Sequence, residues 1–134
     1  MTTKIFVNLP VKDLPRSIAF FKALGWDNNK QFTDETAASI VISEDIYLMI
    51  LTHEKWAKFT DKKIADTKTT AEVAICLSAD SKEGVHQLVD AAVKAGAKEP
   101  RPMADYGFMI QRTFEDLDGH TFEVIHMDPS YVQK

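Results

Sequence analysis

The chain has 134 residues, 45% hydrophobic and 27% charged, a balance that suits one globular domain with a real hydrophobic core. Its formal net charge is −4 and its longest basic cluster is Lys62-Lys63, which argues against a nucleic-acid partner. The single cysteine, Cys76, excludes an intramolecular disulfide, and no apolar segment has signal-peptide or membrane-spanning length. We therefore expect a cytoplasmic protein that binds neither nucleic acid nor membrane.

The first half of the chain predicts a strand, a helix and three more strands. Residues 4–11 are rich in β-forming residues, and Pro10 places that strand at a sheet edge. A helix follows, with Asp13 as its N-cap and Gly25 as its stop. The polar segment 53–69 predicts a linker with a short surface helix. The remaining strands of this half are expected at residues 26–32, 38–43 and 46–52.

The second half predicts the same order of elements. Residues 72–78 form a strand, and Asp80 then caps a helix, with Glu83 as its capping-box partner and Gly96 as its stop. A turn at residues 116–119 joins the last two strands. The strands after the helix are expected at residues 98–103, 108–114 and 121–127.

The two halves form an internal repeat of the order β-α-β-β-β. We expect an α+β fold in which residues 1–134 form a single domain made of two βαβββ modules, about 1–58 and 70–128, joined by the polar linker. The residues that correspond in this repeat are Asp13 with Asp80, Gly25 with Gly96, and Asp45 with Asp118.

Two motifs stand at the two ends of the repeat. The first is Val11-Lys-Asp-Leu-Pro-Arg-Ser17, followed by Phe20-Phe21 and Leu24-Gly25. The second is Asp116-Leu-Asp-Gly-His-Thr-Phe-Glu123. Together they resemble the motifs of the vicinal oxygen chelate superfamily, which contains glyoxalase I, extradiol dioxygenases and the fosfomycin and bleomycin resistance proteins. The resemblance implies the glyoxalase/bleomycin resistance/dioxygenase fold, with each module forming a curved mixed sheet with a cavity. It also implies a homodimer that binds a small molecule.

The resemblance further implies four inward-facing side chains that hold a divalent metal. Counted from the motifs and the repeat, these positions are Phe6, Ile50, Ala74 and Glu123. Only Glu123 has a side chain that binds a cation, and one carboxylate does not make a site for a transition ion. The sequence therefore predicts no cofactor; the alternative is a divalent metal such as Zn, Ni, Mn or Fe, held by residues at other positions.

Four further residues are candidates for the cavity lining. Asn8 shares the strand face of Phe6, and its alternative is a rim residue bonded to backbone. His53 follows the strand that carries Ile50, and its alternative is a surface histidine. Cys76 shares a face with Ala74 and is expected to act as a small apolar residue. The fourth is Gln111, although the pattern of residues 106–114 leaves open which face of that strand points inward.

Glu123 is the single candidate for a catalytic residue. It alternates with Phe122 and Val124, which places it on the inward face of its strand as a ligand contact or a general base. The alternative is a structural carboxylate that pairs with Arg112 or another donor.

Three functions are compatible with these residues. The first is a metal-independent protein that binds a small organic molecule, like the drug-sequestering members of the superfamily. The second is a metal-dependent lyase, similar to lactoylglutathione lyase, or a dioxygenase, with atypical ligands such as Glu123 with His53 or His120. The third is a metal-free isomerase in which Glu123 is the base. The vacant ligand positions favour the first.

Overall fold

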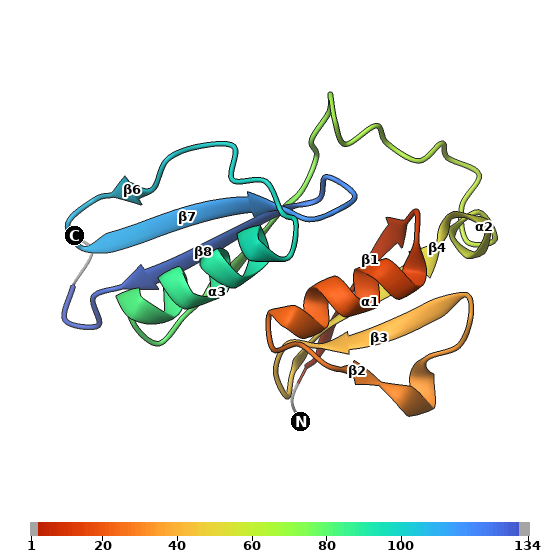
Figure 1. Ribbon diagram of the computed structural model, residues 1–134, viewed down its shortest axis with the longest axis horizontal. Coiled ribbons are helices and arrows are strands. Elements are labelled where there is room, and N and C mark those ends of the chain that lie inside the picture. Colours follow the sequence, from red (N-terminus) through yellow and green to blue (C-terminus); the bar gives the residue numbers. More distant parts are fainter. Residues whose placement is uncertain (1–2, 132–134) are drawn as a thin grey trace. The chain divides into compact units, whose positions relative to one another are not determined.

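The protein's structure, a computed structural model, describes residues 3–131. The chain divides into two compact units, Met1–Ala65 and Asp66–Lys134 (Figure 1). None of the helices in the described part of the chain is long and apolar enough to cross a membrane. The predicted α+β class and the repeated order of elements are confirmed.

Unit 1 contains a four-stranded mixed sheet in the order β1-β4-β3-β2. Strand β1 runs parallel to β4, while the pairs β4/β3 and β3/β2 are antiparallel. The edge position of the strand that contains Pro10 is confirmed, because β1 pairs only with β4. The elements of unit 1 are β1 (Ile5–Val11), α1 (Leu14–Ala23), β2 (Asn28–Asn29), the 3-10 helix η1 (Lys30–Phe32), β3 (Ala37–Val41), β4 (Ile46–Thr52) and α2 (His53–Trp56).

Unit 2 repeats this topology with the sheet order β5-β8-β7-β6. Strand β5 runs parallel to β8, and the remaining neighbours are antiparallel. The helix of this unit is three residues longer than α1, with 13 residues against 10. The elements of unit 2 are β5 (Ala74–Ser78), α3 (Lys82–Lys94), β6 (Ala104–Asp105), β7 (Met109–Glu115) and β8 (Thr121–Met127).

The helix ends follow the predicted capping chemistry, with one correction. The Asp13 carboxylate accepts a hydrogen bond from the Arg16 N–H at 3.1 Å and begins α1 as predicted. The N-cap of α3 is Ser81 and not Asp80: its Oγ accepts from the Gly84 N–H at 2.9 Å. The repeat therefore aligns Asp13 with Ser81, one residue later than predicted.

Two predicted strands are much shorter than expected. Only Asn28 and Asn29 pair with β3 in the segment 26–32, because the Asn29 side chain accepts from the Gln31 N–H at 3.0 Å and starts η1. In the segment 98–103, Lys98 forms an isolated bridge with Glu115 and the ladder resumes only at β6. Pro100 and Pro102 lack the N–H that a ladder needs, which accounts for this interruption.

Each sheet buries one face under its own helix. In unit 2, Ile110 and Phe114 of β7 lie on the same side as Phe122 and Val124 of β8, and all four are at most 2% exposed. The Phe114 and Phe122 rings stack with their centroids 5.1 Å apart. Helix α3 contributes Val85, Val89 and Ala92, each fully buried. Because side chains alternate along a strand, the residues between these core positions face away from α3.

Candidate functional site

Glu123 lies in the middle strand of a polar surface on unit 2. In the register of the sheet it stands between Cys76 of β5 and Thr113 of β7. It is half-buried, and its carboxylate makes no hydrogen bond or ion pair with any residue in the range 3–131. We call this surface the open face of unit 2; its residues are Ala74, Cys76, Ser78, Met109, Gln111, Thr113, Glu115, Thr121, Glu123, Ile125 and Met127.

The register places most of the predicted cavity residues of the second half on this open face. Gln111 pairs with Ile125, so Met109 and Gln111 lie on the face of Glu123, a choice that the sequence left open. Cys76 was expected to be a small buried apolar residue, but the structure shows it exposed. Partial desolvation, and secondly the charge of Glu123, raise the pKa of the Cys76 thiol. With no metal bound, the thiol is therefore protonated at neutral pH, which makes it a weak nucleophile.

The predicted cavity residues of the first half, Phe6, Asn8 and His53, are exposed or bonded to the backbone. Phe6 is 51% exposed and stacks on Tyr47 with 4.8 Å between ring centroids. The Asn8 amide donates to the Phe6 carbonyl oxygen at 3.1 Å, which matches its alternative as a residue bonded to backbone. His53 is the exposed first residue of α2.

Ile50 does not take the position that the repeat predicts. It is 0% exposed and shares its strand face with Leu48 and with its partner Ala38, under α1. The residue equivalent to Glu123 is Met49, because Met49 pairs with Asn8 as Glu123 pairs with Cys76. The prediction counted five residues from Asp45, as Glu123 lies five residues after Asp118. This count is wrong by one residue, because the turn before β4 is one residue shorter than the turn before β8.

Arg112 does not pair with Glu123, contrary to one alternative. It lies on the α3 side of β7, opposite the open face, with Glu99 and two residues of α3. Its Nε and Nη2 donate to the two Glu99 carboxylate oxygens at 2.9 and 2.8 Å, and its Nη1 donates to Asp90 at 2.9 Å. The same Nη1 lies 3.1 Å from His86 Nδ1. Glu99 raises the pKa of Arg112 further, so this cation is permanent.

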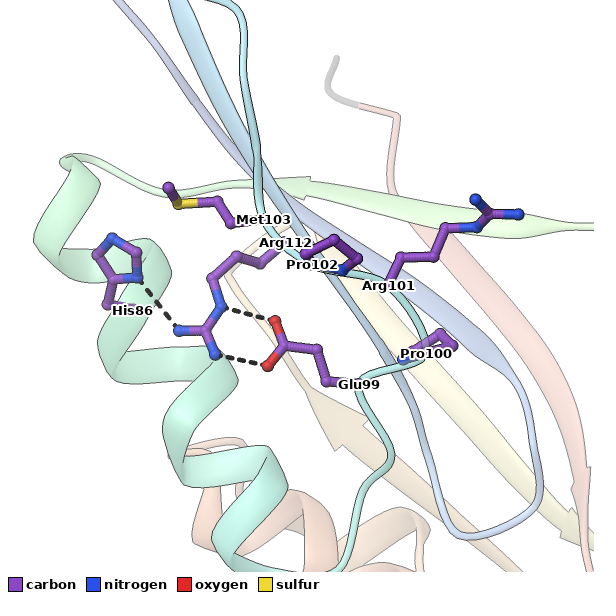
Figure 2. Close-up of a pocket in the computed structure, with 7 residues that line it drawn as sticks. All are labelled: His86, Glu99, Pro100, Arg101, Pro102, Met103 and Arg112. Carbon is purple, nitrogen blue, oxygen red and sulfur yellow. Dashed lines mark hydrogen bonds and ion pairs between the residues drawn. The ribbon is translucent and has the colours of Figure 1, made fainter.

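A groove of about 550 Å³ opens beside this network (Figure 2). The figure shows the Arg112–Glu99 pair between α3 and the irregular segment that precedes β6. The sequence missed this groove, because residues 98–103 were expected to form a strand. The groove is lined by His86, Glu99, Pro100, Arg101, Pro102, Met103 and Arg112.

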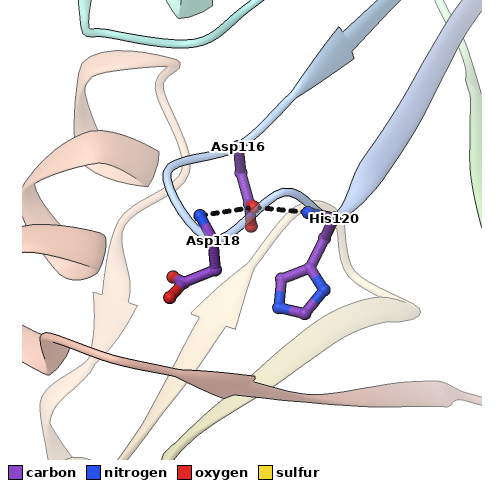
Figure 3. Close-up of side chains that lie close together, drawn as sticks. All are labelled: Asp116, Asp118 and His120. Atoms are coloured by element: carbon purple, nitrogen blue, oxygen red, sulfur yellow. Dashed lines mark hydrogen bonds between the residues drawn. The ribbon is translucent and has the colours of Figure 1, made fainter. Parts of the chain in front are cut away.

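Three potential metal ligands meet at the turn between β7 and β8 (Figure 3). One ligand atom each of Asp116, Asp118 and His120 lies within 4.8 Å of the others. The Asp116 carboxylate, in a residue that is 6% exposed, accepts from the backbone N–H of Asp118 at 3.0 Å and of His120 at 2.8 Å. These bonds are those of a tight turn, so Asp116 already has a structural role.

Burial raises the pKa of Asp116 to about 6, while the charge of His120 acts in the opposite direction. Folding therefore takes up a proton between about pH 4 and pH 6, and the contribution of Asp116 to stability falls as the pH rises through this window.

We expect the difference in unfolding free energy between wild type and Asp116→Asn to fall as the pH rises from about 4 to about 6, measured by urea denaturation. The asparagine side chain keeps an oxygen that can accept these two hydrogen bonds, but it has no carboxyl group to titrate. A difference that does not change with pH would contradict this role.

Comparisons with known proteins agree with this architecture. A family model described as "Glyoxalase/Bleomycin resistance protein/Dioxygenase superfamily" matches residues 5–124. The chain is similar to hypothetical protein SA1046 from S. aureus, with 27% identity and a TM-score of 0.79 over 94% of this chain and 95% of that one. No curated protein matches the sequence significantly.

Two further solved structures share the fold at lower identity. A glyoxalase/bleomycin resistance protein/dioxygenase family enzyme from Burkholderia phytofirmans PsJN has 17% identity and a TM-score of 0.77, over 94% of this chain and 99% of that one. Lactoylglutathione lyase from Agrobacterium tumefaciens has 14% identity and a TM-score of 0.69, over 94% of both chains. These two likenesses concern the fold alone.

Proposed function

The chain belongs to the glyoxalase/bleomycin resistance protein/dioxygenase superfamily, and from this premise we propose that it binds a small organic molecule on the open face of unit 2, at Glu123, without a divalent metal. The observation that carries the proposal is the surroundings of Glu123. Its half-buried carboxylate makes no hydrogen bond or ion pair with the described protein residues and lies among hydrogen-bonding side chains and the apolar Ile125. A mixture of apolar surface and a few polar groups is typical of small-molecule sites.

The donor set on the open face does not fit the transition ion that such folds commonly hold. Glu123 has a thiol on one side, Cys76, and a hydroxyl on the other, Thr113. Ala74, which stands where the resemblance implies a ligand, has no donor atom. Glu115 is the second carboxylate of the face, but its register partner across the sheet is Thr121, so Glu115 does not stand directly opposite Glu123. Glu123 and Cys76 thus supply two strong donor groups at the centre of the face, fewer than the three or four protein ligands of a usual zinc site.

The role of Glu123 can be tested by NMR. We expect benzyl alcohol, benzylamine or benzoate, added to the ¹⁵N-labelled chain, to shift the amide signals of Cys76, Thr113 and Glu123. Glu123→Gln should weaken the best of these probes by about ten-fold, the usual effect of losing a hydrogen bond to a charged group. Glu115→Gln is the matched control, since it removes the other carboxylate of the same face, and it should leave binding within about two-fold. Equal losses in the two variants would exclude a specific role for Glu123.

A metal-dependent lyase or dioxygenase is the second candidate, and the cluster of Asp116, Asp118 and His120 favours it. Two carboxylates and an imidazole are chemically suitable ligands for a divalent ion. Such an ion would compete with the Asp118 and His120 N–H groups for the Asp116 carboxylate.

Metal content separates the two candidates. Inductively coupled plasma mass spectrometry of protein purified without chelator should find less than about 0.1 transition ion per chain if the first proposal holds. About one tightly held ion per chain, lost in Asp118→Asn but retained in Glu115→Gln, would establish the second candidate instead.

Two further expectations accompany the proposal. Glu123, as the one acidic residue at the centre of the face, would serve as the base if the bound molecule is isomerised; retained binding with lost turnover in Glu123→Gln would identify that case. We also expect a homodimer in the cytoplasm, which sedimentation velocity and cell fractionation would test. A monomer at micromolar concentration would contradict the first of these expectations.

A further inference from the structure

The groove beside Arg112 lies on the opposite side of the unit 2 sheet from Glu123. Arg112 alternates with Gln111 and Thr113 along β7, and those two residues belong to the open face. The walls of the groove come from α3 and from residues 99–103 (Figure 2). A ligand in this groove would therefore not touch the residues assigned to the proposed function.

Arg112 presents few polar atoms to the groove. A guanidinium group has five N–H donors in one plane. Nε and one N–H of Nη2 donate to Glu99, and the two N–H groups of Nη1 are taken by Asp90 and His86. Four donors are thus engaged within the plane, and one N–H of Nη2 remains. Arg112 is nevertheless part of the groove lining, with 11% of its side chain exposed.

The ion pairs hold the guanidinium in one orientation. Its flat faces are the surfaces of this group that no hydrogen bond uses, and a flat guanidinium face stacks well on an aromatic ring. His86 contributes a second donor. Because a guanidinium cannot accept a hydrogen bond, His86 Nδ1 is the acceptor in this contact, and the ring proton lies on Nε2.

The remaining walls suit the same kind of molecule. Met103 is 43% exposed, and its thioether is a favourable partner for an aromatic ring. Pro100 and Pro102 fix the backbone torsion φ on both sides of Arg101, which lowers the conformational entropy that this wall can lose when a ligand binds. The groove is open to solvent and has a volume of about 550 Å³, so it has room for one flat ring.

We propose that this groove is a second binding site, and that it takes a planar aromatic molecule carrying a neutral hydrogen-bond acceptor. The ring stacks on the Arg112–Glu99 plane against Met103, and the acceptor receives a hydrogen bond from the remaining Nη2 N–H or from His86 Nε2. Net charge supports a neutral ligand, because the two cations Arg112 and Arg101 balance the two carboxylates Glu99 and Asp90.

A matched pair of probes tests this proposal on the full ¹⁵N-labelled chain. Benzamide has a planar ring and a carbonyl acceptor, while cyclohexanecarboxamide keeps the acceptor and replaces the ring by a puckered one. We expect benzamide to shift the backbone amide signals of Glu99, Arg101 and Met103 saturably, since the two prolines between them give none, and cyclohexanecarboxamide to bind about three-fold more weakly. Shifts that occur only on the open face, or equal binding of the two probes, would overturn the proposal.

Two methionine variants complete the test. Met103→Ala should weaken benzamide binding by about three-fold, the size of a sulfur–aromatic contact. Met127→Ala is the control, since Met127 is exposed to a similar extent, 46%, but lies on the open face. Thermal denaturation of both variants checks that the fold persists. Unchanged binding in the folded Met103→Ala variant would overturn the assigned stacking.

Discussion

The Phe122→Ala variant is expected to lose about 3–4 kcal/mol of unfolding free energy, within the usual range for removing a buried phenylalanine. Phe122 is 0% exposed and stacks on Phe114, which is also fully buried. The variant leaves a void between the sheet and α3, and the surrounding strands cannot close it because their register fixes the backbone. Urea denaturation monitored by circular dichroism measures this loss.

Thr121→Ala is the matched control for Phe122→Ala. Thr121 is the preceding residue of β8, but it is half-buried and lies on the open face. Its replacement is expected to cost less than about 1 kcal/mol. Similar losses for the two variants would mean that the face opposite α3 is packed as tightly as the core, in contradiction to the proposed binding surface.

Gly119→Ala is expected to have the second largest effect, about 2 kcal/mol of unfolding free energy. Gly119 has φ +84°, in the left-handed region of backbone conformation. Any residue with a Cβ is less stable than glycine in this conformation. An added Cβ would also lie 2.5 Å from Thr67 Oγ1. That hydroxyl donates a hydrogen bond to the Asp118 carbonyl oxygen, so the substitution displaces the contact that fastens the end of the linker to the turn.

Gly107→Ala separates the two causes. Gly107 has nearly the same φ, +83°, but an added Cβ there meets no atom within 4 Å. It is expected to cost about 1 kcal/mol, the conformational part alone. In a Thr67→Ala background, the cost of Gly119→Ala should fall toward the cost of Gly107→Ala. If Gly119→Ala is as costly in both backgrounds, contact with Thr67 is not the cause.

Local sequence signals predicted most of the fold. The parts that failed were those in which a side chain competes with the backbone ladder. Asn29 caps η1 and shortens the second strand, and Pro100 and Pro102 interrupt the sixth. Ser81 replaces Asp80 as N-cap because both are good caps, and sequence alone does not rank adjacent candidates.

The site was harder to predict, because a position on a strand face depends on the register. Alternation around Phe122 placed Glu123 correctly on the face away from the helix. The repeat placed Ile50 where Met49 stands, since one residue of difference in a turn exchanges the two faces of the strand. The pairing of Arg112 with Glu99 joins residues from different elements, and no local pattern reports such a contact.

The parallel pairing within each unit also determines when that unit can fold. In unit 1, Ile5 pairs with Ile46, and in unit 2, Ala74 pairs with Thr121, so the first strand of each sheet waits for the last one. Such non-local contacts slow folding, because the intervening chain must close into a loop first. On the ribosome, unit 1 can complete its sheet once residue 52 has emerged. Unit 2 must wait for β8, which makes its sheet the last part of the described chain to form.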